Sequence, residues 1–426
     1  MTDEVTDAGH EAAPPTPPGP LALLRFRPFT ILYLNSTAVI LGVLAQTVAR
    51  GWLAFELTGS NAALGGVLLA FGVTMLVATP WGGVAADRLP KRLVLQVSNG
   101  MLAVSGAWIG LAAAFGVVEY WMLLAAGVLQ ALAFALFGPV RMAFLAEVLH
   151  GESLPSAVGL LLVNAEVNRV VGPAVAGVLI GAWSFGLEAL FLIGALLTTL
   201  GMLVTGALPP GRRAGAPPAR SPLGELTDGV RYVARRPALS SLLWCGIGVT
   251  MVGLPYLAFL PTVASGLFGL GSAGYGILSA TSAVGAVVTG LLLGRRAYRG
   301  RQTRTLAVAG AVMGVGLVGL AVAPIFWIAV VALLVVGGAN LTFQTVNQSL
   351  LLELSDMAYH GRLQGLVMIS FGAFGVAALP LGVLADAIGV RWTFAAMGVG
   401  VIAVVAAFAF FSRGRVARED RLHDLG

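Results

Sequence analysis

Residues 61–92 read NAALGGVLLAFGVTMLVATPWGGVAADRLPKR, a long apolar run that meets its first charge at Asp87 and then becomes a basic cluster. About 20 consecutive apolar residues cross the hydrocarbon core of a bilayer as a helix. The run is therefore long enough to span a membrane. The basic cluster that follows is typical of a loop at the cytoplasmic face.

The composition of the whole chain repeats this pattern. Of its 426 residues, 58% are hydrophobic and 10% are charged, and the mean hydropathy is +0.91. A soluble domain carries about 25% charged residues, so this chain cannot cover itself with a surface that water would wet. A soluble enzyme is excluded, and so is a nucleic-acid-binding protein in spite of the net charge of +6.

Apolar segments of this kind follow one another along the chain. Their hydrophobicity is continuous rather than alternating, which indicates spanning helices and not the strands of a β-barrel. We predict an all-α polytopic membrane protein with twelve transmembrane helices in two pseudo-symmetric six-helix halves. The predicted segments cover about residues 29–53, 61–85, 93–115, 120–146, 156–181, 187–208, 238–264, 273–294, 305–323, 326–352, 363–385 and 391–412.

The longest polar break lies in the middle of the chain and divides it into two halves that resemble each other weakly. Glu147 aligns with Glu353, and Gly159 with Gly365. Such halves enclose a site near the bilayer midplane. The predicted divisions are a disordered tail (1–26), an N-terminal half (27–208), a linker loop (209–237), a C-terminal half (238–412) and a second tail (413–426).

The linker and the distribution of charges predict which loops and termini face the cytoplasm. Residues 223–236 have helical spacing, and this part of the linker either lies on the membrane surface or is a plain basic connection. Lys and Arg gather in the tails and the even-numbered loops, with Arg391 as the clear exception. By the positive-inside rule, both termini face the cytoplasm across the cell's inner membrane. We expect Arg391 and Asp386 to form an exposed pair in one outer turn.

The loop after 61–85 carries the most specific motif. Gly83, Asp87, Arg88, Lys91 and Arg92 match five of the six positions of the signature G-x-x-x-D-R/K-x-G-R/K-R/K, and Pro90 replaces its second glycine. Here the chain resembles the major facilitator superfamily. The resemblance implies a gate in which the Asp87 carboxylate accepts hydrogen bonds from helix N-termini or arginine. The alternative is that DRLPKR is only a basic turn.

Two charged residues near the inner end of 120–146 would join that gate. We expect Arg141 and Glu147 to form a cytoplasmic charge cluster with Asp87. The segment 156–181 contains Gly172, Pro173 and Gly177, whose spacing is similar to the antiporter motif of drug:proton antiporters. The alternative for this second motif is ordinary packing of small residues between helices.

Two further stretches, GWLAFELTGSNAALG (51–65) and GPVRMAFLAEVL (138–149), look like the branch that contains macrolide-type exporters and the siderophore exporter of enterobactin release.

Glu166 and Arg169 are charged residues near the middle of one predicted helix. A charge at this depth is costly if it faces lipid without a partner, and the i,i+3 spacing puts both residues on one face. We predict that this face lines a central cavity with Asn164 and Asn168 as polar neighbours, and that Glu166 is the proton-accepting carboxylate. The alternative is a structural ion pair that locks the helix to a neighbour.

Other polar and aromatic residues within apolar segments are candidates to line a substrate cavity. Each is as well suited to bridging two helices as to touching a substrate. For Arg50, snorkelling to the outer interface is at least as good an interpretation. The candidates are Asn35, Gln46, Arg50, Gln130, Phe134, Tyr256, Asn340, Gln344 and Asn347.

These patterns favour a proton-coupled exporter of amphipathic small molecules that works by alternating access. A dedicated exporter of a siderophore or other natural product, a lysophospholipid flippase and a non-transporting membrane scaffold remain alternatives. The sequence carries no catalytic motif, so we expect no enzyme activity, no cofactor and no metal site. The expected partners are the substrate, protons and the lipid bilayer, without nucleic acid, and we expect a monomer.

Overall fold

The computed structural model describes residues 20–149, 153–182, 186–209, 222–293, 302–356 and 359–412. Inside some helices it leaves individual side chains undescribed, among them those of Gly83, Asp87, Glu166 and Arg169. The predicted tails fall almost wholly outside the described residues, and so does the centre of the linker.

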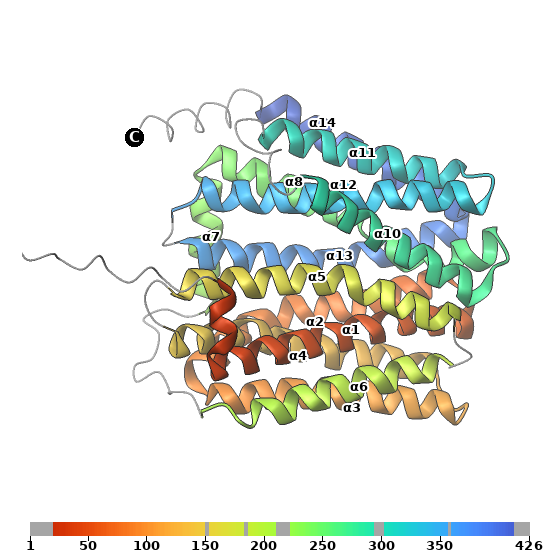
Figure 1. Cartoon of the computed structure of the whole chain (residues 1–426). Coiled ribbons are helices and arrows are strands. Elements are labelled where there is room, and N and C mark those ends of the chain that lie inside the picture. Colours follow the sequence, from red (N-terminus) through yellow and green to blue (C-terminus); the bar gives the residue numbers. More distant parts are fainter. Residues whose placement is uncertain are drawn as a thin grey trace, which may run out of the picture.

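Every element in the described part of the chain is helical, and most of the helices run roughly parallel (Figure 1). The N-terminal elements are the short helix η1 (Pro20–Arg25), α1 (Arg27–Thr58), α2 (Asn61–Arg88), α3 (Lys91–Ala114), α4 (Tyr120–Val148), α5 (Ser153–Ala182) and α6 (Leu187–Thr205). They are followed by α7 (Pro222–Ala234), α8 (Pro237–Gly253), α9 (Tyr256–Thr262), η2 (Val263–Leu267), α10 (Gly271–Leu293), α11 (Gln302–Val322), α12 (Phe326–Glu353), α13 (His360–Ile388) and α14 (Val390–Ser412).

The predicted segments coincide with observed helices, and the all-helical membrane fold is confirmed. By length and hydropathy, eleven helical segments within the described residues can cross a membrane, and α5 adds a helix of 30 residues. The segment expected at 238–264 is not one regular helix. It breaks after α8, because Pro255 has no backbone N–H to continue the helical hydrogen bonds.

The turn between α1 and α2 shows how the sequence sets these boundaries. Gly59 ends α1 with a positive φ of 63°, a conformation that glycine adopts without a steric penalty. The Ser60 hydroxyl then accepts a hydrogen bond from the Ala63 amide at 3.3 Å. This N-cap satisfies one of the free amides at the start of α2.

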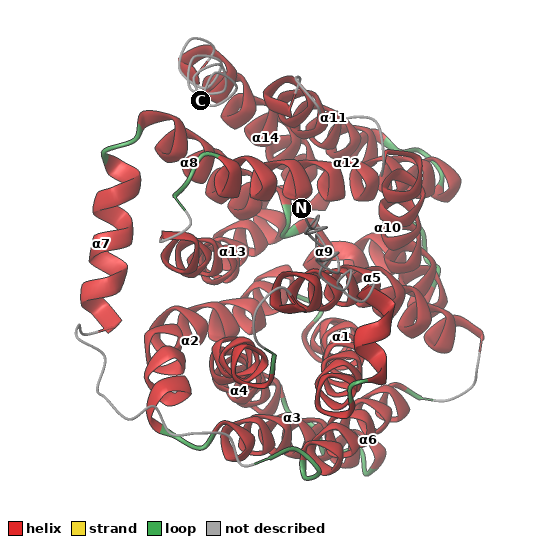
Figure 2. Cartoon of the chain, turned by 60° about the vertical axis from the view of Figure 1, so that its left-hand side comes forward, coloured by secondary structure: helices red, strands yellow, loops and turns green. Residues whose placement is uncertain are grey.

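The helices form two groups, α1–α6 and α8–α14, with α7 along one edge (Figure 2). The two groups meet mainly where α2 packs against α13 and α5 packs against α10. The linker helix α7 contacts α2, α8 and α13. The Tyr232 ring on α7 stacks on the Tyr359 ring at 3.8 Å, so the helix predicted at 223–236 is present and is attached to the C-terminal group. The boundaries of the two predicted halves remain a prediction.

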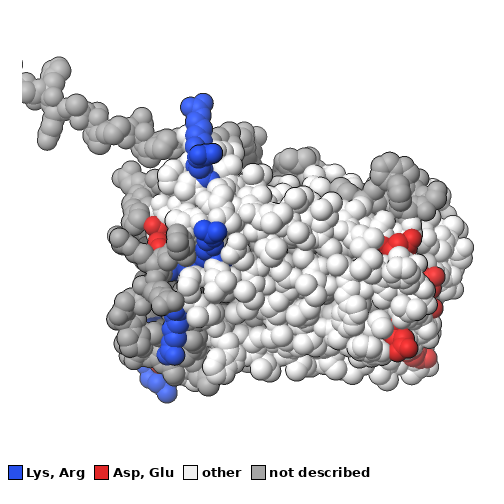
Figure 3. All heavy atoms as spheres, turned by 90° about the horizontal axis from the view of Figure 1, so that it is seen from below, with Lys and Arg blue, Asp and Glu red and all other residues white. Residues whose placement is uncertain are grey.

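Charges occupy opposite ends of the bundle, with a wide uncharged belt between them (Figure 3). We call the end where Lys and Arg gather the basic end. The opposite end, called the acidic end, carries Glu56, Glu119, Glu188 and Asp386 at helix termini. Large apolar side chains such as Val104 and Leu196 lie exposed midway along α3 and α6. Only a lipid environment covers such a surface, so the chain is a multi-pass membrane protein.

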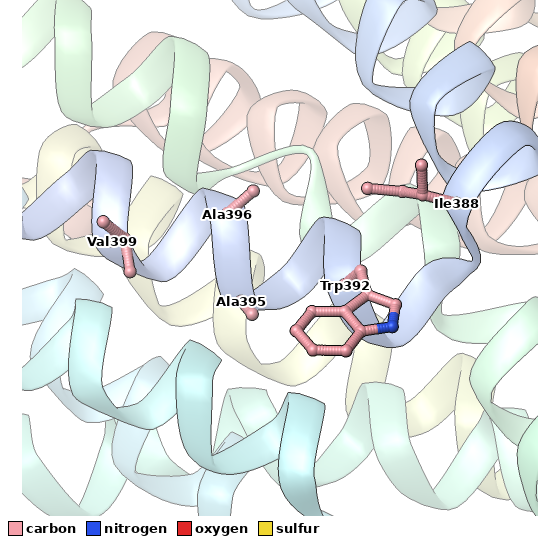
Figure 4. Close-up of a pocket in the computed structure, with 5 residues that line it drawn as sticks. All are labelled: Ile388, Trp392, Ala395, Ala396 and Val399. Carbon is pink, nitrogen blue, oxygen red and sulfur yellow. The ribbon is translucent and has the colours of Figure 1, made fainter.

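A shallow depression on this belt is lined by Ile388, Trp392, Ala395, Ala396 and Val399 (Figure 4). Four of these residues lie on α14, and the Trp392 side chain is 70% exposed. The lining is almost wholly apolar and opens sideways from the bundle. We assign it to the lipid-facing surface, where acyl chains fill it, and not to a site within the protein.

Glycines let α2 and α13 approach each other closely near the middle of both helices. A Cβ atom added at Gly72 would lie 2.5 Å from the Gly372 carbonyl oxygen and 2.8 Å from the Gly375 Cα. A Cβ added at Gly375 would in turn lie 2.7 Å from the Gly72 Cα. Both backbones therefore touch directly, and the two groups of helices are closed at this level. We call this contact the glycine seam.

The replacement Gly72→Ala tests the glycine seam. Its Cβ has no room against the α13 backbone, so we expect α2 and α13 to move apart and the two groups of helices to separate further. With spin labels at Leu57→Cys and Ile388→Cys in a Cys245→Ser background, double electron–electron resonance should show a second population at a longer distance. Gly138→Ala is the matched control, because a Cβ there meets nothing within 4 Å. Identical distance distributions for both variants would refute the role of the seam.

Candidate functional site

A cavity of about 290 Å³ lies between the two groups of helices. Its walls come from α1, α2 and α4 on one side and from α9, α10 and α13 on the other. Most of the lining is apolar, which suits the nonpolar part of a small molecule. The lining residues are Val43, Leu44, Thr47, Val48, Arg50, Gly51, Ala54, Leu64, Val67, Leu68, Phe71, Gln130, Phe134, Leu257, Ala258, Tyr275, Ser279 and Phe374.

Arg50 is the charged residue of this lining, and it is deeply buried. Its side chain is 4% exposed, and its Nη1 donates a hydrogen bond of 2.6 Å to Gln130 Oε1. The remaining donors, Nε and Nη2, find no acceptor among the described residues. A buried guanidinium without an ionic partner is costly, so the fold tolerates a marked electrostatic penalty at this point.

The cavity is closed toward the acidic end by contacts between α1 and α10. The Trp52 ring stacks on the Tyr275 ring with centroids 5.6 Å apart. The Tyr275 hydroxyl donates a hydrogen bond of 3.1 Å to the Val48 carbonyl oxygen. Because α1 and α10 belong to different groups of helices, these contacts have to break before the cavity can open on that side.

A second closure, which we call the Asp386 latch, joins α13 to the start of α2. Asp386 Oδ1 accepts hydrogen bonds from the Asn61 amide at 2.8 Å and from Asn61 Nδ2 at 2.9 Å. Its Oδ2 accepts from the Ser60 hydroxyl at 2.7 Å and from the Ala62 amide at 2.9 Å. One carboxylate thus satisfies free amides at a helix N-terminus, where negative charge is favoured.

The expected turn pair between Asp386 and Arg391 is wrong. Arg391 Nη1 donates instead to the carbonyl oxygens of Ala321 and Ala323, at 3.0 and 2.8 Å. These carbonyls lie at the end of α11, where a cation is favoured. The Asp386 carboxylate lies at the start of α2 for the corresponding electrostatic reason, because free amides at a helix N-terminus favour an anion. The Gly59-Ser60 boundary marks the free amides at the start of α2, but it does not tell which carboxylate accepts from them.

Comparison with known proteins agrees with this architecture. Residues 18–423 match the model of a family described as transmembrane secretion effector, within the major facilitator superfamily. The chain belongs to this family. It is therefore a transporter and not an enzyme.

The relatives of this transporter include the enterobactin exporter EntS of Shigella boydii serotype 18. It is 26% identical over 354 residues, which cover 81% of this chain and 82% of the relative. The enterobactin exporter of Escherichia coli O139:H28 is 25% identical over the same shares.

The fold is shared with solved transporters at low sequence identity. A bacterial homolog of the human lysosomal transporter Spinster, in an inward-facing and unoccupied conformation, has a TM-score of 0.72 and 16% identity, covering 92% of this chain and 98% of that one. The nucleoside transporter NupG has a TM-score of 0.69 and 15% identity, covering 91% and 99%.

The transporter brings together only part of the predicted substrate site. Arg50, Gln130 and Phe134 line the cavity. Two other candidates on α1 do not: Asn35 Oδ1 accepts a hydrogen bond of 2.7 Å from Asn99 Nδ2 on α3, and Gln46 lies between α3 and α6, where it limits the space at Gly106 and Gly194. Asn35 thus bridges two helices by a hydrogen bond, and Gln46 packs between helices of the same group.

The polar candidates of the C-terminal half also lie away from this cavity. The Tyr256 hydroxyl shares a hydrogen bond of 2.6 Å with Ser282. On α12, Gln344 Nε2 donates to the Thr250 hydroxyl of α8 at 3.4 Å, and Asn347 fills the space beside Gly246 of the same helix. Asn340 is half-buried on α12 and is not part of the lining.

The predicted proton-coupling face is described only in part. Asn164 Oδ1 accepts a hydrogen bond of 3.0 Å from Thr37, and its Nδ2 donates to the Tyr33 carbonyl oxygen at 3.3 Å. Asn168 Nδ2 donates to the Asn164 carbonyl oxygen at 2.7 Å. Asn164 therefore fixes α5 against α1, whereas Asn168 bonds to Asn164 within α5. The side chains of Glu166 and Arg169 lie outside the described residues, so their predicted roles stay predictions.

The gating motif is likewise only partly described. Lys91 Nζ lies 2.9 Å from Glu147 Oε2 and joins α3 to α4, and Arg92 Nη1 donates to the Leu208 carbonyl oxygen at 3.1 Å. The Arg141 guanidinium lies 5.4 Å from the centre of the Phe137 ring. Arg88 is exposed at the basic end. The surroundings of Gly83 and the side chain of Asp87 lie outside the described part of the structure. The predicted cluster with Asp87 therefore stays a prediction.

One glycine of the antiporter-like motif makes a close helix contact. A Cβ added at Gly172 would lie 2.6 Å from the Leu44 side chain on α1. Small-residue packing therefore accounts for this position. The surroundings of Pro173 and Gly177 lie outside the described part of the structure.

Asp386→Asn tests the latch. Both oxygens of Asp386 accept hydrogen bonds. In the variant, the asparagine NH₂ group replaces one of these oxygens and faces the same N–H and O–H donors, so closure at the acidic end should weaken. These bonds are partly exposed, and we expect a loss of about 1 kcal/mol, a roughly fivefold shift toward the open state. The spin-label pair at Leu57→Cys and Ile388→Cys measures this shift. Glu119→Gln is the control, because within the described part of the chain that exposed carboxylate accepts from Trp121 nearby and from no residue of the other group. A shift of equal size there would contradict the latch.

Proposed function

We propose that this protein is a secondary active exporter of amphipathic small molecules, driven by protons through alternating access. The observation that supports the proposal most directly is the cavity between the two groups of helices. It is apolar, holds one buried polar pair, and is closed toward the acidic end by contacts that join the two groups. A cavity at such an interface can change its exposed side when the groups rock against each other.

The proposed direction of transport is outward. We place the basic end at the cytoplasm of the cell's inner membrane, with both termini there, because Lys and Arg gather at that end. The described contacts then close the outer side. A substrate that enters from the cytoplasm is released after the glycine seam and the Asp386 latch have opened.

Glu166 is our proposed proton acceptor. Successive helical residues are about 100° apart, so position 166 falls on the opposite side of α5 from position 164, whose side chain faces α1. Since α5 also packs against α10 of the other group, a titrating group on that helix can influence the contact between the halves. Arg169 would tune its pKa.

A dedicated exporter of one natural product is the second candidate. The curated relatives named above are enterobactin exporters, and this favours secretion of a small molecule made by the cell. Export of drugs and movement of a lysophospholipid are further forms of the same transport cycle. We propose a monomer as the working unit.

Glu166→Gln tests the proton coupling. Because glutamine cannot release or accept the coupling proton, accumulation of a fluorescent amphipathic dye in proteoliposomes under an imposed pH gradient should fall to the level of protein-free liposomes. Exchange of the dye at equal pH should continue, since it requires no net proton movement. Membrane insertion should be unchanged.

Glu56→Gln provides the matched carboxylate. Its side chain accepts a hydrogen bond of 3.1 Å from Trp52 and lies outside the cavity lining. Because Trp52 takes part in the outer closure, Glu119→Gln, whose carboxylate accepts from the exposed Trp121 instead, is measured beside it. Full coupling in Glu166→Gln would disprove the role of that residue. Absence of dye transport in the unmodified protein, with flipping of a labelled lysophospholipid instead, would favour the lipid substrate.

A further inference from the structure

The buried pair of Arg50 and Gln130 has three hydrogen-bond donors at the cavity that lack an acceptor in the described part of the chain. Arg50 Nε and Nη2 and Gln130 Nε2 have no partner among the described residues. Gln130 Oε1 already accepts from Arg50 Nη1. The pair therefore presents three free donors beside one positive charge, and an acceptor oxygen with negative charge satisfies them best.

The free edge of the guanidinium has the geometry of an oxyanion site. Nε and Nη2 lie side by side on one edge of the planar group, and such an edge binds both oxygens of a carboxylate through two parallel hydrogen bonds. The third free donor, Gln130 Nε2, belongs to the residue that holds the opposite edge in place. The described lining contains no Asp or Glu that could occupy the site from within the protein.

The depth of Arg50 separates this arrangement from snorkelling. The residue lies eight positions before the end of α1 at Thr58, which is about 12 Å at 1.5 Å per residue. At 4% exposure, its head group stays inside the protein and does not reach water. Around it the walls are apolar and aromatic, with Phe71, Phe134 and Phe374.

We propose that the cavity binds amphipathic organic anions, with a carboxylate or similar acidic oxygen on the free edge of Arg50 and the apolar body against the phenylalanines. The substrate class is thus narrowed to small molecules that carry one acidic group. That the bound anion is cargo rests on the proposed transport function. The binding preference itself can be measured without transport.

The experiment compares naphthoate with naphthamide, which share one aromatic body and differ in charge. Isothermal titration calorimetry on the full chain in lipid nanodiscs gives the ratio of their two affinities. We expect naphthoate to bind roughly tenfold more tightly in the unmodified protein, as a charge-assisted bidentate pair requires. The ratio should fall to about one in Arg50→Gln, and Arg50→Lys should retain part of it because lysine keeps the charge without the fork.

Gln130→Glu supplies a second variant that keeps Arg50 in place. Its carboxylate neutralises the guanidinium from within, so the preference for naphthoate should vanish while the pair stays buried. Naphthoate should also raise the melting temperature of the unmodified protein and leave that of Gln130→Glu unchanged. Arg391→Gln, which removes an arginine remote from the cavity lining, should keep the full ratio.

The outcomes separate this inference from the transport proposal. An affinity ratio near one in the unmodified protein, or an equal ratio in Arg50→Gln, overturns the anion site even if dyes are transported. Displacement of naphthoate by chloride at equal concentration would mark a site for inorganic anions and also overturn it. A clear naphthoate preference without flux in proteoliposomes would support the anion site and refute the exporter.

Discussion

A guanidinium buried within a bilayer has to find its hydrogen-bond acceptors inside the protein, because hydrocarbon supplies none. Gln130 provides one acceptor for Arg50 and leaves one edge of the group free. The same constraint acts on the backbone, where helices satisfy their own amides and carbonyls. At the helix ends, Asp386 and Arg391 provide the missing partners. The structure thus provides partners for these two charged groups at the termini, while Arg50 and Gln130 keep free donors beside the cavity.

Most of the fold could be predicted from the sequence, because membrane helices are marked by length and hydropathy alone. The run before Asp87 and the Gly59-Ser60 boundary are visible without any knowledge of neighbouring helices. The break at Pro255 was missed for a physical reason. Proline is common in membrane helices, so its presence alone does not distinguish a kink from an interruption.

The candidate site could be predicted less completely. Helical spacing tells which residues share a face, but it does not tell which neighbour that face meets. From the sequence, Asn35, Gln46 and Arg50 are therefore equally good candidates to line the cavity. The packing of α3 and α6 shows that Asn35 and Gln46 lie within one group of helices instead. The Asp386 latch joins residues 325 positions apart in the chain, a separation over which no local pattern carries information.

The glycine seam has a mechanical consequence. At Gly72 and Gly375 the contact is between backbones, so parting the chains at these two positions requires no rotamer change of either residue. Dispersion forces weaken within a fraction of an ångström of separation. Such a contact resists the first small movement and then offers almost no resistance. Such a contact favours two discrete states, closed and open, over a continuous range of separations.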